Sequence, residues 1–165
     1  MNAATQLTQP VINIMTHALD DSPVILKLIE KAFENAGINQ YRLFAKEQEF
    51  IDAINEDVHI AVIDYMLGGP LTGLDVLRIL IDKNPRCYVI IMSGQEEKKV
   101  VVDFLNAGAW KYVDKTGEFV TEVIGYVQQA ATLVKENLTF YHTLLTKVKN
   151  REDESFTGSR ENVAG

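Results

Sequence analysis

Five side chains that could take part in phosphoryl chemistry are spread along this 165-residue chain. They are three carboxylates, one hydroxyl and one ammonium: Asp20, Asp21, Asp64, Ser93 and Lys115. Carboxylate oxygens are the ligands that a hard divalent cation such as Mg²⁺ prefers. A carboxylate beside Mg²⁺ can also attack phosphorus, because the metal neutralises charge on the transferred group. These residue types therefore indicate a metal-assisted phosphoryl acceptor, provided that the fold brings them together.

The order of the predicted strands and helices would bring these five side chains together. Ser22 can cap a first helix whose first position is Pro23. Further helices are predicted wherever apolar residues recur at helical spacing. Between the helices, apolar runs with β-branched residues predict strands at residues 11–19, 41–45, 58–65, 87–92 and 110–113. Five alternations of strand and helix predict an α/β protein, with helices on both faces of a parallel sheet.

Each of the five reactive residues lies at or just beyond the end of a predicted strand. The carboxyl ends of parallel strands share one edge of a sheet, which is where ligands bind in such folds. Two like charges about 4 Å apart repel by roughly 4 kcal/mol at an effective dielectric constant near 20, so the acids need a cation. Taken singly, an aspartate after a strand is more often a helix cap, and a lone lysine is usually solvated. Only the whole set favours a phosphoryl site.

Four segments carry a resemblance to a known family: 19–22 (LDDS), 62–66 (VIDYM), 91–94 (IMSG) and 108–115 (GAWKYVDK). Together they resemble the signature segments of receiver domains of two-component response regulators, over about residues 11–131. The resemblance implies a doubly wound, five-stranded parallel sheet of the flavodoxin-like type, similar to the chemotaxis regulators, with strand order 2-1-3-4-5.

The same resemblance implies a role for each site residue. Asp64 would receive a phosphoryl group from a histidine kinase or a histidine phosphotransfer protein. Mg²⁺ would be held by Asp20, Asp21, Asp64 and the backbone carbonyl of Met66. Lys115 would pair with the phosphoryl group. The chain would then be a signalling module of a phosphorelay rather than an enzyme.

The resemblance also implies a switch. The Ser93 hydroxyl would move toward the phosphoryl group, and the Tyr112 ring would follow it inward. Phosphorylation would in this way bias a two-state surface formed by the helix after Ser93, the last strand and the last helix.

Three features depart from the family pattern. Thr116 stands where the family usually has a proline after a cis peptide bond, and a cis bond before threonine costs about 2.5–4 kcal/mol. We therefore expect a trans bond, with the Lys115 head still reaching the site. The loop at 66–73 (MLGGPLTG) is one residue longer than usual. Met66 and Gln95 flank the site without offering a general base, so we expect a phosphorylated state that is not unusually short-lived.

The pattern predicts a receiver domain at 9–131, a helical extension at 132–150 and a disordered tail at 151–165. A helix over 118–149 would be about 48 Å long, more than the diameter of a small domain. Its distal half carries an apolar stripe that continues through Leu138, Tyr141, Leu145 and Val148. Pairing with a second copy of the chain would cover this stripe, giving a homodimer. The alternative is a helix that folds back or frays.

Composition narrows the remaining possibilities. A net charge of −7 argues against a nucleic-acid-binding surface. The single cysteine, Cys87, cannot form an intrachain disulfide and is expected to be a buried thiol. Neither a secretory signal nor a membrane span is apparent, so a cytoplasmic protein is expected.

Other functions stay open at this point. The chain could be the N-terminal receiver of a longer transcription regulator. A small α/β phosphatase is disfavoured because Met66, two residues after Asp64, is not the second acid that aspartate-nucleophile phosphatases use. A flavin carrier is disfavoured because the first strand ends in two acids, where a flavin phosphate needs hydroxyls and backbone amides.

Overall fold

The structure is a computed structural model that describes residues 12–94 and 98–158. The chain divides into two compact units, one up to Ala131 and one from Thr132 onward. We describe each unit by itself.

The first unit is built on a parallel sheet whose five strands have the order β2-β1-β3-β4-β5. This confirms the fold class and the strand order that the resemblance implied. Residues in two of the interior strands, β3 and β4, are almost all buried, as expected for strands covered on both faces. The strands are β1 (Met15–Leu19), β2 (Tyr41–Phe44), β3 (Val58–Asp64), β4 (Tyr88–Ser93) and β5 (Lys111–Asp114).

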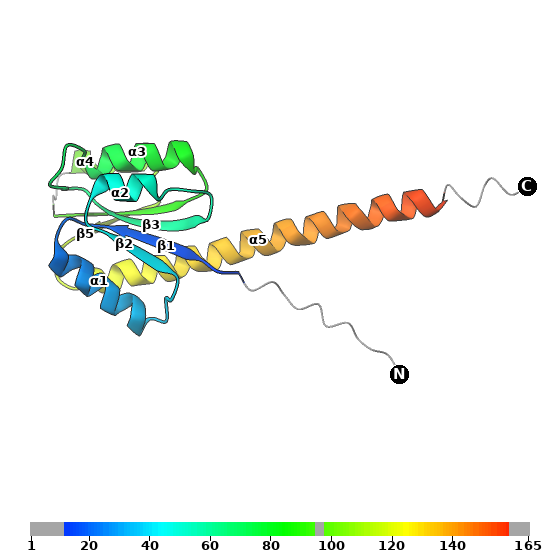
Figure 1. Ribbon diagram of the computed structural model, residues 1–165, viewed down its shortest axis with the longest axis horizontal. Coiled ribbons are helices and arrows are strands. Elements are labelled where there is room, and N and C mark those ends of the chain that lie inside the picture. The colour runs from blue at the N-terminus through cyan, green and yellow to red at the C-terminus, as the bar shows by residue number, and fades with distance from the viewer. Residues whose placement is uncertain (1–11, 95–97, 159–165) are drawn as a thin grey trace, which may run out of the picture. The chain divides into compact units, whose positions relative to one another are not determined.

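Helices cover both faces of the sheet, as Figure 1 shows. The helices α2, α3 and α4 lie on one face, and α1 and the beginning of α5 lie on the other (Figure 1). Their bounds are α1 (Pro23–Asn35), α2 (Glu47–Asp52), α3 (Gly73–Lys83), α4 (Lys98–Asn106) and α5 (Phe119–Gly158).

Each face has its own hydrophobic core because consecutive strand residues point to opposite sides. In β3, Ala61 and Ile63 pack with helices α2, α3 and α4, whereas Ile60 and Val62 pack with α1 and α5. The sheet is therefore fixed from both sides, and the carboxyl ends of its strands are held at a constant spacing.

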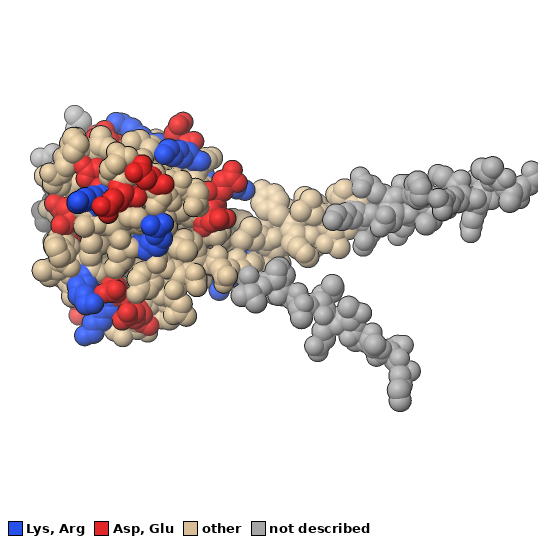
Figure 2. Space-filling model, in the orientation of Figure 1, with Lys and Arg blue, Asp and Glu red and all other residues tan. Residues whose placement is uncertain are grey.

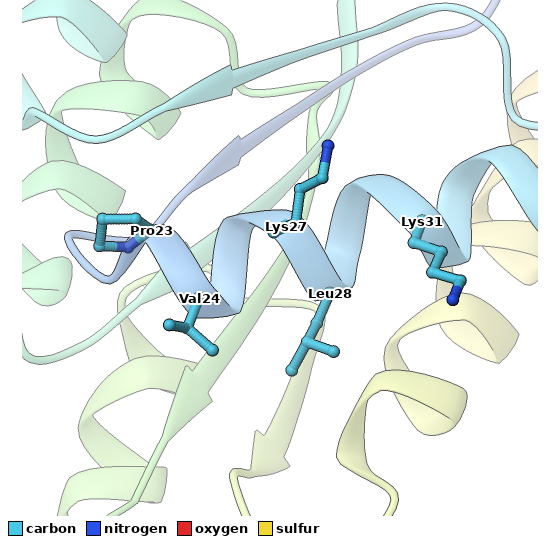
Figure 3. Close-up of a pocket in the computed structure, with 5 residues that line it drawn as sticks. All are labelled: Pro23, Val24, Lys27, Leu28 and Lys31. Atoms are coloured by element: carbon cyan, nitrogen blue, oxygen red, sulfur yellow. The ribbon is translucent and has the colours of Figure 1, made fainter.

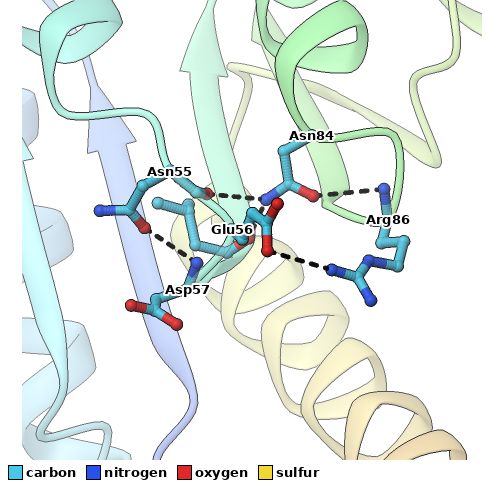
Figure 4. A network of polar contacts seen from close by, with 6 residues as sticks. Asn55, Glu56, Asp57, Asn84 and Arg86 are labelled. Carbon is cyan, nitrogen blue, oxygen red and sulfur yellow. Dashed lines mark hydrogen bonds and ion pairs between the residues drawn. The ribbon is translucent and has the colours of Figure 1, made fainter.

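A buried amide ties together the two strands that carry Asp64 and Ser93. The Asn84 side chain donates to the carbonyl oxygens of Asn55 and Val58, at 3.0 and 2.8 Å, and accepts from the Arg86 backbone N–H at 3.3 Å. Figure 4 shows this network joining the segments that enter β3 and β4. Because buried amides must be hydrogen-bonded, the network anchors the starts of both strands.

Local signals set the helix starts. The Ser22 hydroxyl accepts from the Ile25 N–H, and Pro23 opens α1, as predicted. At α3, Thr72 and Asp75 form a reciprocal capping box, which places the first turn of this helix directly after the loop that follows Asp64.

The second unit is the continuation of α5. Within the described part of this unit, all side chains at 135–148 are exposed. The helix reaches Gly158, so residues 151–158 are helical where the sequence pattern predicted a disordered tail. No proline or glycine precedes Gly158 in this stretch, so nothing in it breaks the helix. Residues 159–165 of that tail lie outside the described residues, and the other expected domain bounds stay predictions.

Between Thr132 and Val148, α5 carries three charged residues, Lys135, Glu136 and Lys147. Figure 2 shows mostly uncharged side chains on the visible face of its described portion. Nevertheless, none of the helices that the structure describes is long and apolar enough to cross a membrane.

Candidate phosphoryl-acceptor site

Three carboxylates meet at the carboxyl edge of the sheet. Asp20 directly follows β1, Asp64 is the last residue of β3, and Asp21 is the next residue after Asp20. One oxygen atom of each carboxylate lies within 4.8 Å of the others. Asp20 and Asp64 are buried and Asp21 is exposed, so the cluster has one side open to solvent.

Lys115 brings a positive charge into this cluster from the end of β5. Its Nζ lies 2.6 Å from Oδ2 of Asp20 and 2.9 Å from Oδ1 of Asp64. No peptide bond in the described residues is cis, so the bond to Thr116 is trans and the lysine still reaches the acids, as expected. The Lys115 backbone N–H donates to the Ser93 carbonyl at 2.9 Å, which joins the ends of β4 and β5.

The surroundings of Asp64 raise its pKa to about 6. Burial is the largest cause, because a charged carboxylate is poorly solvated there, and the nearby Asp20 charge adds to it. Hydrogen bonds from Lys115 and from the Met66 backbone N–H act in the opposite direction by stabilising the ionised form. Asp64 thus changes its charge at a pH closer to neutral than an ordinary aspartate does.

Lys115 stays cationic in this position. Burial alone would lower its pKa, but the hydrogen bonds and charges of Asp20 and Asp64 outweigh that effect and raise the pKa. The lysine is therefore a fixed positive charge between two buried acids, suited to pairing with a phosphoryl oxygen.

Asp20 is oriented more firmly than Asp21. Besides the contact with Lys115, Asp20 accepts a hydrogen bond from the Ser22 backbone N–H at 2.9 Å. No hydrogen bond or ion pair within the described residues holds the Asp21 carboxylate. The two adjacent acids thus differ: the Asp20 carboxylate is held in place, whereas the Asp21 carboxylate can change its orientation.

The two expected switch residues lie on neighbouring strands. Ser93 ends β4 and is fully buried. Tyr112 lies in β5, is half-buried, and stacks on Phe104 of α4 with ring centroids 6.1 Å apart. The structure thus puts Ser93 at the same sheet edge as Asp64, and Tyr112 against the helix that follows Ser93. Gln95 lies outside the described residues.

The loop after Asp64 is packed through glycines. A side chain at Gly68 would meet the Asp21 carboxylate, and one at Gly69 would meet the Glu47 carboxylate of α2. A side chain at Gly73 would meet the backbone of Asp64. The sequence pattern gives no reason to single out Glu47, because only the folded loop brings it near Gly69. The pair of adjacent glycines, 68 and 69, is the one sequence feature that could have indicated such close packing.

The oxygen atoms at this edge fit a hard divalent cation. Three carboxylates with a single neighbouring ammonium leave an excess of negative charge, and carboxylate oxygens are the ligands such ions take. The exposed Asp21 leaves a route by which a hydrated ion can enter. The donor set thus agrees with the expected Mg²⁺.

Comparison with known proteins gives a consistent result. The family model described as response regulator receiver domain matches residues 17–122. The transcriptional regulatory protein ComA of Bacillus subtilis is 23% identical over 138 residues, covering 81% of this chain and 64% of that protein. A putative response regulator, NtrX-like, of Rickettsia typhi is 31% identical over 99 residues, covering 59% of this chain and 21% of that protein. The chain thus spans less than two thirds of the length of these relatives.

Solved structures agree on the fold. The receiver domain of the Francisella response regulator 1452 matches with a TM-score of 0.65 and 26% identity, covering 74% of this chain and 99% of that one. A CheY-like receiver domain from Methanospirillum hungatei gives a TM-score of 0.65 at 22% identity, covering 74% and 98%. At that lower identity the second match speaks for the fold alone.

Proposed function

Because this chain belongs to the family of response regulator receiver domains, we propose that it accepts a phosphoryl group on Asp64 within a two-component phosphorelay. One observation carries the proposal: the buried Asp64 carboxylate lies 2.9 Å from the Lys115 ammonium, in a group of three carboxylates whose oxygens lie within 4.8 Å of one another. Family membership also disfavours the phosphatase and flavin-carrier alternatives.

In the proposed reaction, an Asp64 oxygen forms a bond to phosphorus while the phosphorus–nitrogen bond of a donor phosphohistidine breaks. The imidazole nitrogen keeps the electron pair of that bond. Asp64 must be ionised to attack, which its pKa of about 6 allows at neutral pH. Lys115 would stabilise one phosphoryl oxygen, and the Ser93 hydroxyl would donate to another.

Mg²⁺ would be held by Asp20, Asp21, Asp64 and the backbone carbonyl of Met66. When bound, it would neutralise charge on the transferred group. Asp20 would hold the ion rigidly, since the Ser22 N–H and Lys115 already orient it. The buried position of Asp64 would limit water at the reacting oxygen.

We infer that the chain is modified rather than acting as an enzyme with turnover. Hydrolysis of the phosphorylated aspartate needs an activated water, and the Met66 side chain, 56% exposed beside the site, offers no base. The proposed output is a change of the surface formed by α4, β5 and the beginning of α5. In that change, Ser93 and Tyr112 would move toward the phosphoryl group.

The donor partner would be a histidine kinase or a histidine phosphotransfer protein, and α1 offers a surface for it. This helix begins right after the acids, so its exposed side chains lie nearest to a docked donor. Val24 and Leu28 are 68% and 47% exposed. With Pro23, Lys27 and Lys31 they line a shallow pocket (Figure 3). Apolar contacts flanked by lysines suit an amphipathic helix that carries acidic residues.

We also propose that a second copy of this chain covers the distal part of α5. Leu138, Tyr141, Leu145 and Val148 are 39–62% exposed and spaced three and four residues apart, the pattern of a coiled-coil seam. Identical stripes on two copies form a closed, two-fold contact, which is the commonest kind of homo-oligomer.

What the whole protein controls is also part of this proposal, because the chain spans only part of its relatives' length. A net charge of −7 supports output through protein contacts rather than direct nucleic-acid binding. A cytoplasmic location is likewise part of the proposal.

The test of the function is incubation with a small acyl phosphate and Mg²⁺, followed by intact-mass measurement. The wild type should gain one phosphoryl group, and Asp64→Ala should gain none. Asp82→Ala, which removes an exposed aspartate from α3, is the matched control and should gain as much as the wild type. An unmodified wild type, or equal modification of Asp64→Ala, would overturn the proposal.

A further inference from the structure

The unusual loop after Asp64 touches the metal-binding acids at one glycine. An added Cβ at Gly68 would lie 2.9 Å from Oδ2 of Asp21, closer than real Cβ contacts come. At the next residue, an added Cβ at Gly69 would overlap the Glu47 carboxylate. Two adjacent glycines thus lie against two different carboxylates, only one of which belongs to the metal-binding group.

Space, rather than backbone conformation, explains these glycines. Gly37, Gly108 and Gly117 have positive φ angles, which favour glycine for conformational reasons. Gly68 and Gly69 do not, so their backbone could carry a side chain without strain. What a side chain would disturb is the neighbouring carboxylate.

The Asp21 carboxylate is the part that would yield. It is exposed, and no hydrogen bond within the described residues holds it, whereas Lys115 and the Ser22 N–H hold Asp20. A methyl group at position 68 would therefore rotate Asp21 away at little cost in folding free energy. By contrast, a methyl group at Gly73 would meet the main chain of Asp64 and Tyr65, which cannot move aside cheaply.

We propose that Gly68 is a positioning residue for the metal ion: its lack of a side chain keeps the Asp21 carboxylate aimed into the group formed with Asp20 and Asp64. This inference rests on the proposed function, since it assumes that these acids take Mg²⁺. The loop at 66–73 would then help to set the affinity for Mg²⁺, because it fixes the orientation of the Asp21 carboxylate.

The test is a calorimetric titration of the intact chain with Mg²⁺ alone, without a phosphodonor. Gly68→Ala should weaken Mg²⁺ binding by about tenfold, as is typical when the group that orients a ligand is altered. Its unfolding temperature without metal should equal that of the wild type. Asp21→Ala should also weaken binding, and Gly68→Ala added to it should cause no further loss, because both changes act through the same carboxylate.

Two matched substitutions control for general disturbance. Gly94→Ala alters the loop after β4, where an added Cβ meets nothing, and should keep the wild-type affinity. Gly69→Ala alters the same loop as Gly68, but its added Cβ meets the Glu47 carboxylate first, and this variant should keep the wild-type affinity too. Loss of affinity in Gly69→Ala equal to that in Gly68→Ala, or unchanged affinity in Gly68→Ala, would overturn the inference. A wild type that binds no Mg²⁺ would instead overturn the proposed metal site.

Discussion

The Lys115 ammonium lies 2.6 Å from a carboxylate oxygen of Asp20, a residue 95 positions earlier in the chain. The same ammonium lies 2.9 Å from Asp64. Two acids buried at one sheet edge are thereby paired with a single cation that follows the edge strand β5. This contact links the stability of the domain to the chemistry of its site.

Removal of the Lys115 charge should destabilise the metal-free domain. Lys115→Met leaves Asp20 and Asp64 buried without a cation, and breaking a buried pair in this way costs about 3–5 kcal/mol. Thermal unfolding in a chelator should show the loss, and added Mg²⁺ should recover part of it by neutralising the same acids. A variant as stable as the wild type in the chelator would contradict this account.

Asp64 should make folding stability depend on pH between about 4 and 6. Its folded pKa, about 6, lies above the ordinary value of 3.8. Between these two pH values the Asp64 carboxyl is therefore protonated in the folded chain and ionised in the unfolded chain. The contribution of Asp64 is therefore largest below pH 4 and is lost as the pH rises through 6.

The buried His17, whose pKa is lowered to about 4, acts in the opposite sense over part of this range. The difference between wild type and Asp64→Asn isolates the Asp64 effect. In urea unfolding at a series of pH values, the stability of Asp64→Asn relative to wild type should rise from pH 4 to 6 and then level off. A difference that does not change with pH would show that the pKa of Asp64 is not raised.

Gly73→Ala should lower stability and acceptor activity together. The added methyl group meets the Asp64 carbonyl and the Tyr65 Cα, so the end of β3 must shift. Overpacking of this kind costs about 1–3 kcal/mol. Urea unfolding measures the cost, and acyl phosphate labelling measures the acceptor. Gly94→Ala, with open space around it, should change neither.

Leu28→Glu should impair phosphorylation by a protein donor but not by a small acyl phosphate. A charge at this α1 position would disrupt apolar docking without reaching the acids. Leu105→Glu on α4 replaces a leucine of similar exposure, 50% against 47%, and is the control. We expect at least a tenfold slower transfer from a cognate kinase for the Leu28 variant only. Equal effects of both substitutions would argue against docking on α1.

Leu145→Lys should weaken self-association of the chain. The substitution puts two like charges face to face in the proposed seam, where apolar side chains would otherwise pack. Phe140→Lys changes a residue of similar exposure, 64% against 62%, that lies off the stripe. Sedimentation equilibrium should show at least a tenfold weaker dimer for Leu145→Lys and a small change for Phe140→Lys. A wild type that stays monomeric at every concentration would rule out the pairing.

Much of this molecule follows from sequence alone. Strands such as β3 and β4 are continuous apolar runs, because both of their faces are buried, and Ser22-Pro23 marks a helix start through local hydrogen bonding and a preset φ angle. Once the strands are parallel, their carboxyl ends must share an edge, so residues as distant as Asp20 and Lys115 could be predicted to meet.

Only the tertiary structure determines the features that depend on distances across this edge of the sheet. The pairing of Lys115 with both Asp20 and Asp64, and the raised pKa of Asp64, follow from burial and from separations that no spacing rule encodes. The approach of Gly68 to Asp21 depends on how the eight-residue loop between β3 and α3 closes, which is equally beyond sequence periodicity. The chain itself thus determined which groups gather around Asp64, and the packing of the sheet and its loops determined how firmly each one is held.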